Sequence, residues 1–167
     1  MRAMPMSIRQ QAGIALRAVE FGELPADAVV RWADGVITTE QRPSHWLIDL
    51  SLLDSERFDE MLRLLHEHAE HMESRQVDIC ILAQLFFADR LSTEQLFQRA
   101  FAACRVDYKG STSEPFKQLT RILCEWDQLN VPDLGQAHWR LQISEALVKC
   151  QRAYGDLTQF VSQLYAA

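Results

Sequence analysis

The sequence predicts an all-α protein, and three observations lead to that prediction. Apolar residues recur at helical spacing along most of the chain, and no segment alternates apolar and polar residues over a strand length. The stretch 76–90 is apolar almost all round, as expected of a buried helix. Serine, aspartate, glycine and proline stand where helices would begin or end. We therefore expect a single globular bundle of about eight or nine helices.

Four amphipathic helices are expected before residue 76. The first covers residues 7–20, and Pro25 opens the second, where its fixed φ suits a first helical turn. Ser44 is expected to cap a short third helix, and Asp54 or Ser55 to cap a fourth that runs to about residue 74. The residues expected to be buried on the fourth helix are Phe58, Met61, Leu62, Leu65, Ala69 and Met72.

Five further helices are expected, with 76–90 as the central one. Ser92 and Gln95 form the pattern of a capping box at the start of the next helix, which ends near Cys104. The remaining helices are expected over 113–130, 133–154 and 156–164. On the longest of these, the inward line is expected to be Leu134, Leu141 and Val148.

The length of 167 residues fits one helical domain over 1–167. The expected helix starts form pairs about 40 residues apart, which is the repeat length of HEAT-like solenoids, so a short α-solenoid is the alternative architecture. The first residues show no secretory signal, and Met1, Met4 and Met6 are all possible starts.

The four cysteines predict the compartment. Cys80, Cys104, Cys124 and Cys150 lie far apart, and each falls in the apolar stripe of an expected helix. Free cysteine is among the most buried residue types, so we expect reduced, buried thiols and a cytoplasmic protein.

The charge is uneven along the chain. The net charge is −6, and residues 1–73 account for all of it with 13 acidic and 7 basic side chains, whereas residues 74–167 carry 10 of each. An acidic field disfavours nucleic acid and anionic membranes and favours a basic protein partner. The acidic residues proposed to bind this partner lie on the fourth expected helix: Glu56, Asp59, Glu60, Glu67 and Glu70.

No catalytic or metal-binding pattern is complete in this sequence. There is no G-x-S-x-G elbow and no glycine-rich phosphate loop, so the prediction is a protein that is not an enzyme and has no cofactor. His66, His68 and His71 form the one cluster that could hold a metal, but their spacing differs from H-E-x-x-H. We expect a solvated helix face without metal, and keep a small helical enzyme or metal-binding protein using this cluster as an alternative.

The four tryptophans are expected to play two roles. Trp32, Trp46 and Trp126 lie on apolar stripes and are expected in the core. Trp139 lies off the expected inward line of its helix, next to Arg140, and tryptophan beside arginine is common in protein interfaces. Trp139 is therefore added to the partner-binding set.

Three pieces of the sequence resemble a known class of protein. They are Val30-Arg31-Trp32-Ala33-Asp34, Leu47-Ile48-Asp49-Leu50-Ser51-Leu52, and Tyr154-Gly155-Asp156-Leu157 followed by Phe160 and Leu164. Together they are similar to the small helical bacterial immunity proteins encoded beside polymorphic or contact-dependent toxins.

The resemblance implies a non-enzymatic cytoplasmic protein that binds and blocks one cognate toxin domain. Many such toxins are basic, which agrees with the acidic half of this chain. We expect a monomer or weak homodimer that binds neither nucleic acid nor membrane. A helical adaptor or scaffold protein is a further alternative.

Overall fold

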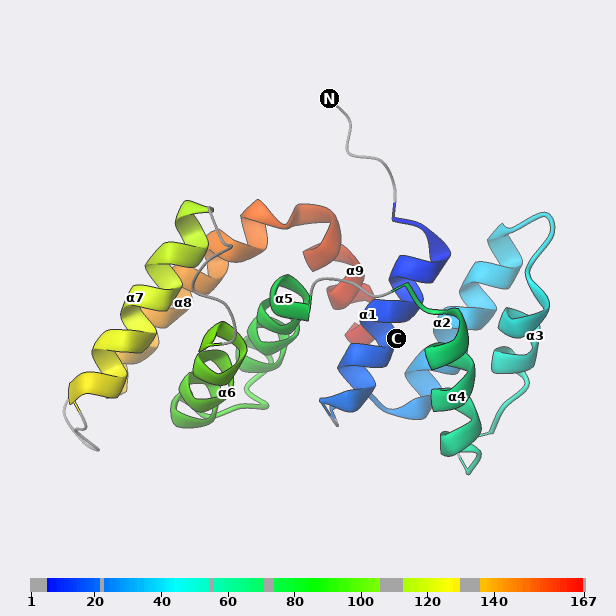
Figure 1. Cartoon of the computed structure of the whole chain (residues 1–167), viewed down its shortest axis with the longest axis horizontal. Helices are drawn as coiled ribbons and strands as arrows, with labels where there is room; N and C mark the ends of the chain where they lie inside the picture. The colour runs from blue at the N-terminus through cyan, green and yellow to red at the C-terminus, as the bar shows by residue number, and fades with distance from the viewer. Residues whose placement is uncertain are drawn as a thin grey trace. The chain divides into compact units, whose positions relative to one another are not determined.

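The computed structural model describes residues 6–21, 23–54, 56–70, 74–105, 113–129 and 136–166. Within these ranges the chain forms nine α-helices and no β-strand, which confirms the all-α fold class (Figure 1). No helix in the described ranges is both long and apolar enough to cross a bilayer.

The helices begin close to the positions expected from their capping residues. In chain order they are α1 (Ile8–Glu20), α2 (Ala26–Thr39), α3 (His45–Ser51), α4 (Phe58–His68), α5 (Ser74–Phe87), α6 (Thr93–Arg105), α7 (Glu114–Leu129), α8 (Gln136–Ala153) and α9 (Gly155–Ala166). Several residues named above lie outside the described ranges: Met1, Met4, Ser55, His71, Met72 and Leu134. Asp133, the first residue of the helix expected over 133–154, also lies outside them.

The chain divides into two compact units, which are described separately. Unit 1 comprises residues 1–74 and 159–167, and therefore contains α1 to α4 and most of α9. Unit 2 comprises residues 75–158, and therefore contains α6 to α8 and all but the first residue of α5. The expectation of one domain over 1–167 stays a prediction.

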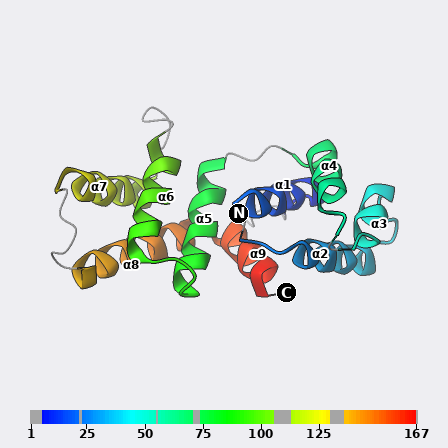
Figure 2. The same ribbon diagram turned by 90° about the horizontal axis from the view of Figure 1, so that it is seen from below.

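Unit 1 is organised around α1 and α2. A complete capping box starts α1, because the Ser7 hydroxyl accepts from the Gln10 N–H at 3.2 Å and the Gln10 side chain accepts from the Ser7 N–H at 2.9 Å. In both views α4 lies beside α1, and α3 lies beside α2 (Figures 1 and 2). Ile14, Leu47 and Leu65 are among the fully buried side chains that fill the space between these helices.

Unit 2 contains the helix that the sequence marked as central. Every residue from Val77 to Ala83 on α5 is buried, so this helix is covered on all sides, as its composition predicted. Phe86 and Phe97, on α5 and α6, are among the largest fully buried side chains. The Ser92 capping box is confirmed at the start of α6: the Ser92 hydroxyl accepts from the Gln95 N–H at 3.1 Å, and the Gln95 side chain accepts from the Ser92 N–H at 2.9 Å.

Helix α5 ends at Phe87 rather than at residue 90, because the backbone turns back on itself there. The N–H of Arg90 donates to the carbonyl of Leu85 at 2.9 Å, and the N–H of Asp89 donates to that of Phe86 at 3.0 Å. This is the Schellman arrangement, and Asp89 occupies its left-handed position with φ 54°. Phe87, next to this turn, is 44% exposed, so the expectation that it is buried with the rest of 76–90 is wrong.

The inward line expected on α8 is wrong. Leu141 is 60% exposed and Val148 is half-buried, whereas Ile143, Ala146, Leu147 and Cys150 are buried. The buried face is rotated around the helix, so Trp139 lies four residues before Ile143 on the same side. The premise that Trp139 points away from the interior was therefore incorrect.

Candidate functional site

The acidic residues proposed for partner binding do not all lie on one helix. The structure starts α4 at Phe58 with Arg57 at the N-cap position, so the expectation that Asp54 or Ser55 caps this helix is wrong. The helix ends at His68, where Ala69 is already extended and the N–H of Glu70 donates to the carbonyl of Arg9 at 2.9 Å. Glu56 therefore precedes the helix and Glu70 follows it.

The acidic residues also differ in their ion pairing. Glu60 pairs with Arg57, and Glu67 pairs with Arg63 at 2.8 Å. Within the described residues, the carboxylates of Glu56, Asp59 and Glu70 make no ion pair, and all three residues are exposed. Of the five proposed acidic residues, Glu56, Asp59 and Glu70 therefore present the carboxylates that a partner can reach without breaking an ion pair of the described residues.

Two large apolar side chains are exposed beside this charge. Leu52, just after α3, is 75% exposed, and Phe58, the first residue of α4, is 40% exposed. Phe58 was expected to face inward, but the buried residues of α4 are Met61, Leu64 and Leu65. An N-terminal position one turn before Met61 leaves Phe58 at the edge of the interior. We call the described residues 52–54 and 56–59 the acidic turn, because Leu52 and Phe58 lie there together with Asp54, Glu56 and Asp59.

The division of charge follows the two units. All 13 acidic and 7 basic residues of the N-terminal part lie in unit 1, and residues 159–167 add no charge, so unit 1 carries −6. Unit 2 holds 10 acidic and 10 basic residues and is neutral overall. Unit 1 is therefore the unit with a long-range attraction for a basic partner.

The histidines of α4 have separate surroundings. His66 Nε2 lies 3.7 Å from a carboxylate oxygen of Glu20 on α1. The His68 ring stacks on Trp46, with ring centroids 5.1 Å apart and an interplanar angle of 15°. In the part of the chain that the structure describes, no three His, Cys, Asp or Glu side chains gather as metal ligands, but His71 lies outside that part. The absence of a metal stays a prediction.

The tryptophans are less uniformly buried than expected. Trp46 is buried, but Trp32 and Trp126 are half-buried. Trp139 belongs to unit 2 and is also half-buried, with its ring edge-to-face on Phe97 at 5.9 Å, and Trp126 packs on the same ring at 4.9 Å. Trp139 thus packs within unit 2, while the five acidic residues belong to unit 1; its role in binding stays a prediction.

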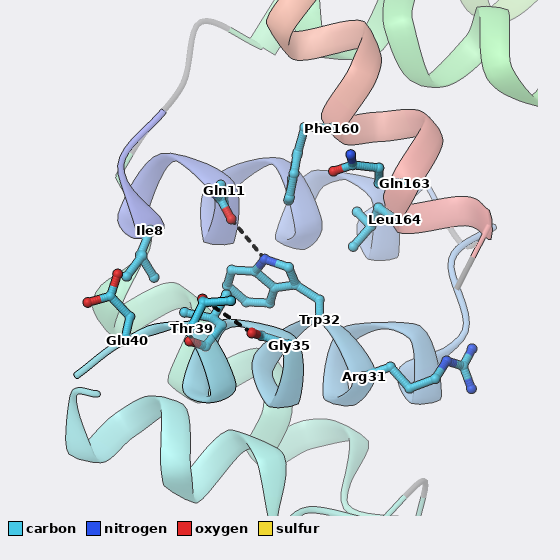
Figure 3. A pocket seen from close by; sticks show the side chains of 11 residues that line it. Ile8, Gln11, Arg31, Trp32, Gly35, Thr39, Glu40, Phe160, Gln163 and Leu164 are labelled. Atoms are coloured by element: carbon cyan, nitrogen blue, oxygen red, sulfur yellow. Dashed lines mark hydrogen bonds between the residues drawn. The ribbon is translucent and has the colours of Figure 1, made fainter. Parts of the chain in front are cut away.

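Unit 1 also contains an open groove that the sequence did not predict (Figure 3). Its volume is about 330 Å³, and it lies among α1, α2 and the unit 1 part of α9. Trp32 forms its middle: the indole N–H donates to the Gln11 side chain at 3.0 Å, and the ring meets Phe160 edge-to-face at 6.5 Å. Glu40 lies toward one end of the groove and Arg31 toward the other (Figure 3).

Gly35 is the unusual residue of this groove. It lies inside α2, where glycine costs about 0.5–1 kcal/mol relative to alanine. A Cβ built on Gly35 would meet no atom within 4 Å, so packing within the protein does not require a glycine there. The glycine leaves the backbone of α2 open on the side that lines the groove.

The cysteines of unit 2 are structural. Cys80, Cys104 and Cys150 are buried, and Cys124 is half-buried, so the expected burial is confirmed for three of the four. Desolvation raises the pKa of Cys80 and of Cys104 to about 11, and that of Cys150 to about 12. Such thiols are protonated at neutral pH and are poor nucleophiles.

No protein-family model, curated protein or solved structure matches this chain. The resemblance to immunity proteins stays a prediction.

Proposed function

We propose that this chain is a non-enzymatic bacterial immunity protein, which binds and neutralises a cognate basic toxin domain in the cytoplasm. The observation that carries the proposal is the acidic turn of unit 1. It combines the carboxylates of Glu56 and Asp59, which make no ion pair within the described residues, with the exposed side chains of Leu52 and Phe58. All of them lie in the unit that holds the whole net charge.

The two kinds of side chain would serve different steps of binding. Exposed charges attract an oppositely charged partner and raise its association rate by about 10–1000-fold, an effect that salt screens. Apolar side chains contribute to affinity once they are buried at the centre of an interface, where charged residues are depleted. In the acidic turn, Leu52 and Phe58 would be such a centre, with Glu56 and Asp59 at its rim.

The proposal is tested by co-expressing the chain with the toxin encoded beside its gene, in a bacterial host. We expect the native chain to restore growth. Leu52→Ala with Phe58→Ala should abolish protection, because both apolar contacts are lost. A matched control is Phe87→Ala with Leu141→Ala, which removes two exposed apolar side chains from unit 2 and should leave protection intact.

Thermal melting of each purified variant separates a loss of binding from a loss of folding. A folded Leu52/Phe58 variant that still protects the host would contradict the proposed interface. A native chain that fails to bind the neighbouring gene's product would contradict the proposed function.

A further inference from the structure

We propose that the groove of unit 1 binds an extended peptide segment of five residues. Its first residue is basic, its third is apolar and its fifth is acidic, and the second and fourth can be any residue. The inference goes beyond the proposed function, because the groove shares no residue with the acidic turn. The groove has opposite charges at its two ends and an apolar surface between them.

Opposite charges mark the two ends. Arg31 and Glu40 both line the groove, and neither makes an ion pair within the described residues. Both residues are exposed, so a bound molecule can reach them. The Arg31 guanidinium would recognise a carboxylate, and the Glu40 carboxylate would recognise an ammonium or guanidinium group.

The backbone separation of these two residues along α2 matches an extended chain. The backbone positions of Arg31 and Glu40 are nine residues apart along α2 and its C-cap, and a rise of 1.5 Å per residue places them about 13 Å apart along the helix axis. In an extended segment, which rises about 3.3 Å per residue, positions 1 and 5 are separated by the same distance. Position 3 then lies midway.

The alternation of an extended chain places these positions on one face. Side chains 1, 3 and 5 of an extended segment point the same way, so a segment with charged ends would direct its third side chain into the middle of the groove. Trp32 and Phe160 line that middle region, and the indole N–H of Trp32 is already bonded to Gln11 (Figure 3). An apolar third side chain fits the rings of Trp32 and Phe160, because a polar group buried against these rings would lose hydration.

Gly35 supplies the independent observation. A helix-interior glycine that internal packing does not require is explained when another chain passes close to the helix backbone. Gly35 lies between Arg31 and Glu40 on α2, where the peptide would cross. The groove therefore suits the pattern basic–x–apolar–x–acidic, in either chain direction.

The test uses synthetic peptides and the full chain. The probe is acetyl-Lys-Ser-Leu-Ser-Glu-amide, and its control is the isomer acetyl-Lys-Leu-Ser-Ser-Glu-amide, in which leucine faces the opposite way. Binding is followed by NMR through the chemical shift of the Trp32 indole N–H proton. This signal is assigned by its absence from the spectrum of Trp32→Phe. We expect the probe to shift this signal and to bind at least about threefold more tightly than its isomer.

Two glycine variants form a matched pair. Gly35→Ala should reduce affinity for the probe about tenfold or more, since its methyl group would occupy the path of the peptide. Gly155→Ala is the control, because a Cβ there also meets no atom within 4 Å and Gly155 lies outside the groove. Both variants should fold as the native chain does, which thermal melting checks.

Charge complementation tests the two ends. Arg31→Glu should weaken binding of the probe about two- to fivefold, and should bind acetyl-Lys-Ser-Leu-Ser-Lys-amide better than the native chain does. Any of three results would overturn the inference. The probe and its isomer bind with equal affinity, Gly35→Ala leaves the affinity for the probe unchanged, or Arg31→Glu binds acetyl-Lys-Ser-Leu-Ser-Lys-amide no better than the native chain does. None of these outcomes bears on toxin binding by the acidic turn, so the two proposals fail separately.

Discussion

The two units of this chain differ in where their distinctive residues lie. Unit 1 carries the entire net charge of −6 and exposes Leu52 and Phe58 near Glu56 and Asp59 in the sequence, whose carboxylates make no ion pair in the part of the chain that the structure describes. Unit 2 is neutral, and its distinctive features are internal: α5 is buried on all sides, and Phe97 contacts both Trp126 and Trp139. Exposed charges contribute little to folding, so the excess charge of unit 1 calls for an explanation outside folding.

Substitution of Phe86 should show the largest effect and tests the interior of unit 2. Phe86 is 1% exposed, and Arg140 lies over its ring with the guanidinium carbon 4.9 Å from the centroid. We expect Phe86→Ala to lower the free energy of unfolding by about 3–5 kcal/mol, as measured by urea denaturation.

The neighbouring Phe87, which is 44% exposed, provides the control. Phe87→Ala should cost much less, because its side chain already contacts water. Similar losses for the two variants would mean that α5 is not the packed interior described above.

Alkaline pH should produce the next largest effect. The pKa of Cys80 is about 11 in the folded protein and about 9 in the unfolded chain, so the folded state holds its proton more tightly. Between pH 9 and 11 the unfolded thiol has lost this proton, and the free energy of unfolding should fall by at most about 1.4 kcal/mol per pH unit for each such thiol. Below pH 9 both states are protonated, and this contribution is constant.

Urea titrations between pH 8 and pH 10.5 measure that slope. Cys80→Ala should make it shallower, whatever its effect on stability at neutral pH. A slope that is unchanged in Cys80→Ala would show that this thiol does not contribute.

The two capping boxes allow the same small change, the loss of an N-cap serine side chain, to be made in each unit. Ser7 in unit 1 and Ser92 in unit 2 make the same pair of hydrogen bonds. We expect Ser7→Ala and Ser92→Ala each to cost about 1 kcal/mol, and Ser92→Gly only a few tenths. Equal losses for Ser92→Ala and Ser92→Gly would mean that the serine side chain does not stabilise α6.

Hydrogen exchange on these capping variants also tests the single-domain prediction. If the two units unfold together, each substitution should lower protection in both. If Ser7→Ala affects only α1 to α4, the units are separate folding units.

The local features of this fold were predictable from sequence, because they depend on neighbours in the chain. The capping box at Ser92 predicted the start of α6. The apolar composition of residues 76–90 predicted the burial of α5. The Ser7 box was missed, although the same Ser-x-x-Gln pattern is present there.

The features that were not predicted depend on distant residues. Helix α4 ends early where Glu70 bonds to Arg9, and the groove needs α9 to pack beside α1 and α2. On α8, Leu141 is apolar yet exposed, so periodicity alone selected the wrong face. The acidic residues were identified from composition, but their ion pairing required the structure.

Charge reversal in the acidic turn should have the smallest effect on stability and the clearest effect on binding. Glu56→Lys with Asp59→Lys removes two exposed carboxylates that have no ion pair among the described residues. Asp59 lies in the first turn of α4, so its reversal should cost less than about 1 kcal/mol. Glu60 is less informative, because its reversal would also break the pair with Arg57.

The most direct test of the proposed function is the association rate between this chain and the protein encoded by the neighbouring gene, measured by stopped flow at low and high salt. The control variant is Asp127→Lys with Glu145→Lys, which makes the same charge change in unit 2. We predict that Glu56→Lys with Asp59→Lys slows association about tenfold or more at low salt, that high salt removes the difference, and that the control changes the rate little. Equal rates for the two variants at low salt would contradict binding through the acidic turn.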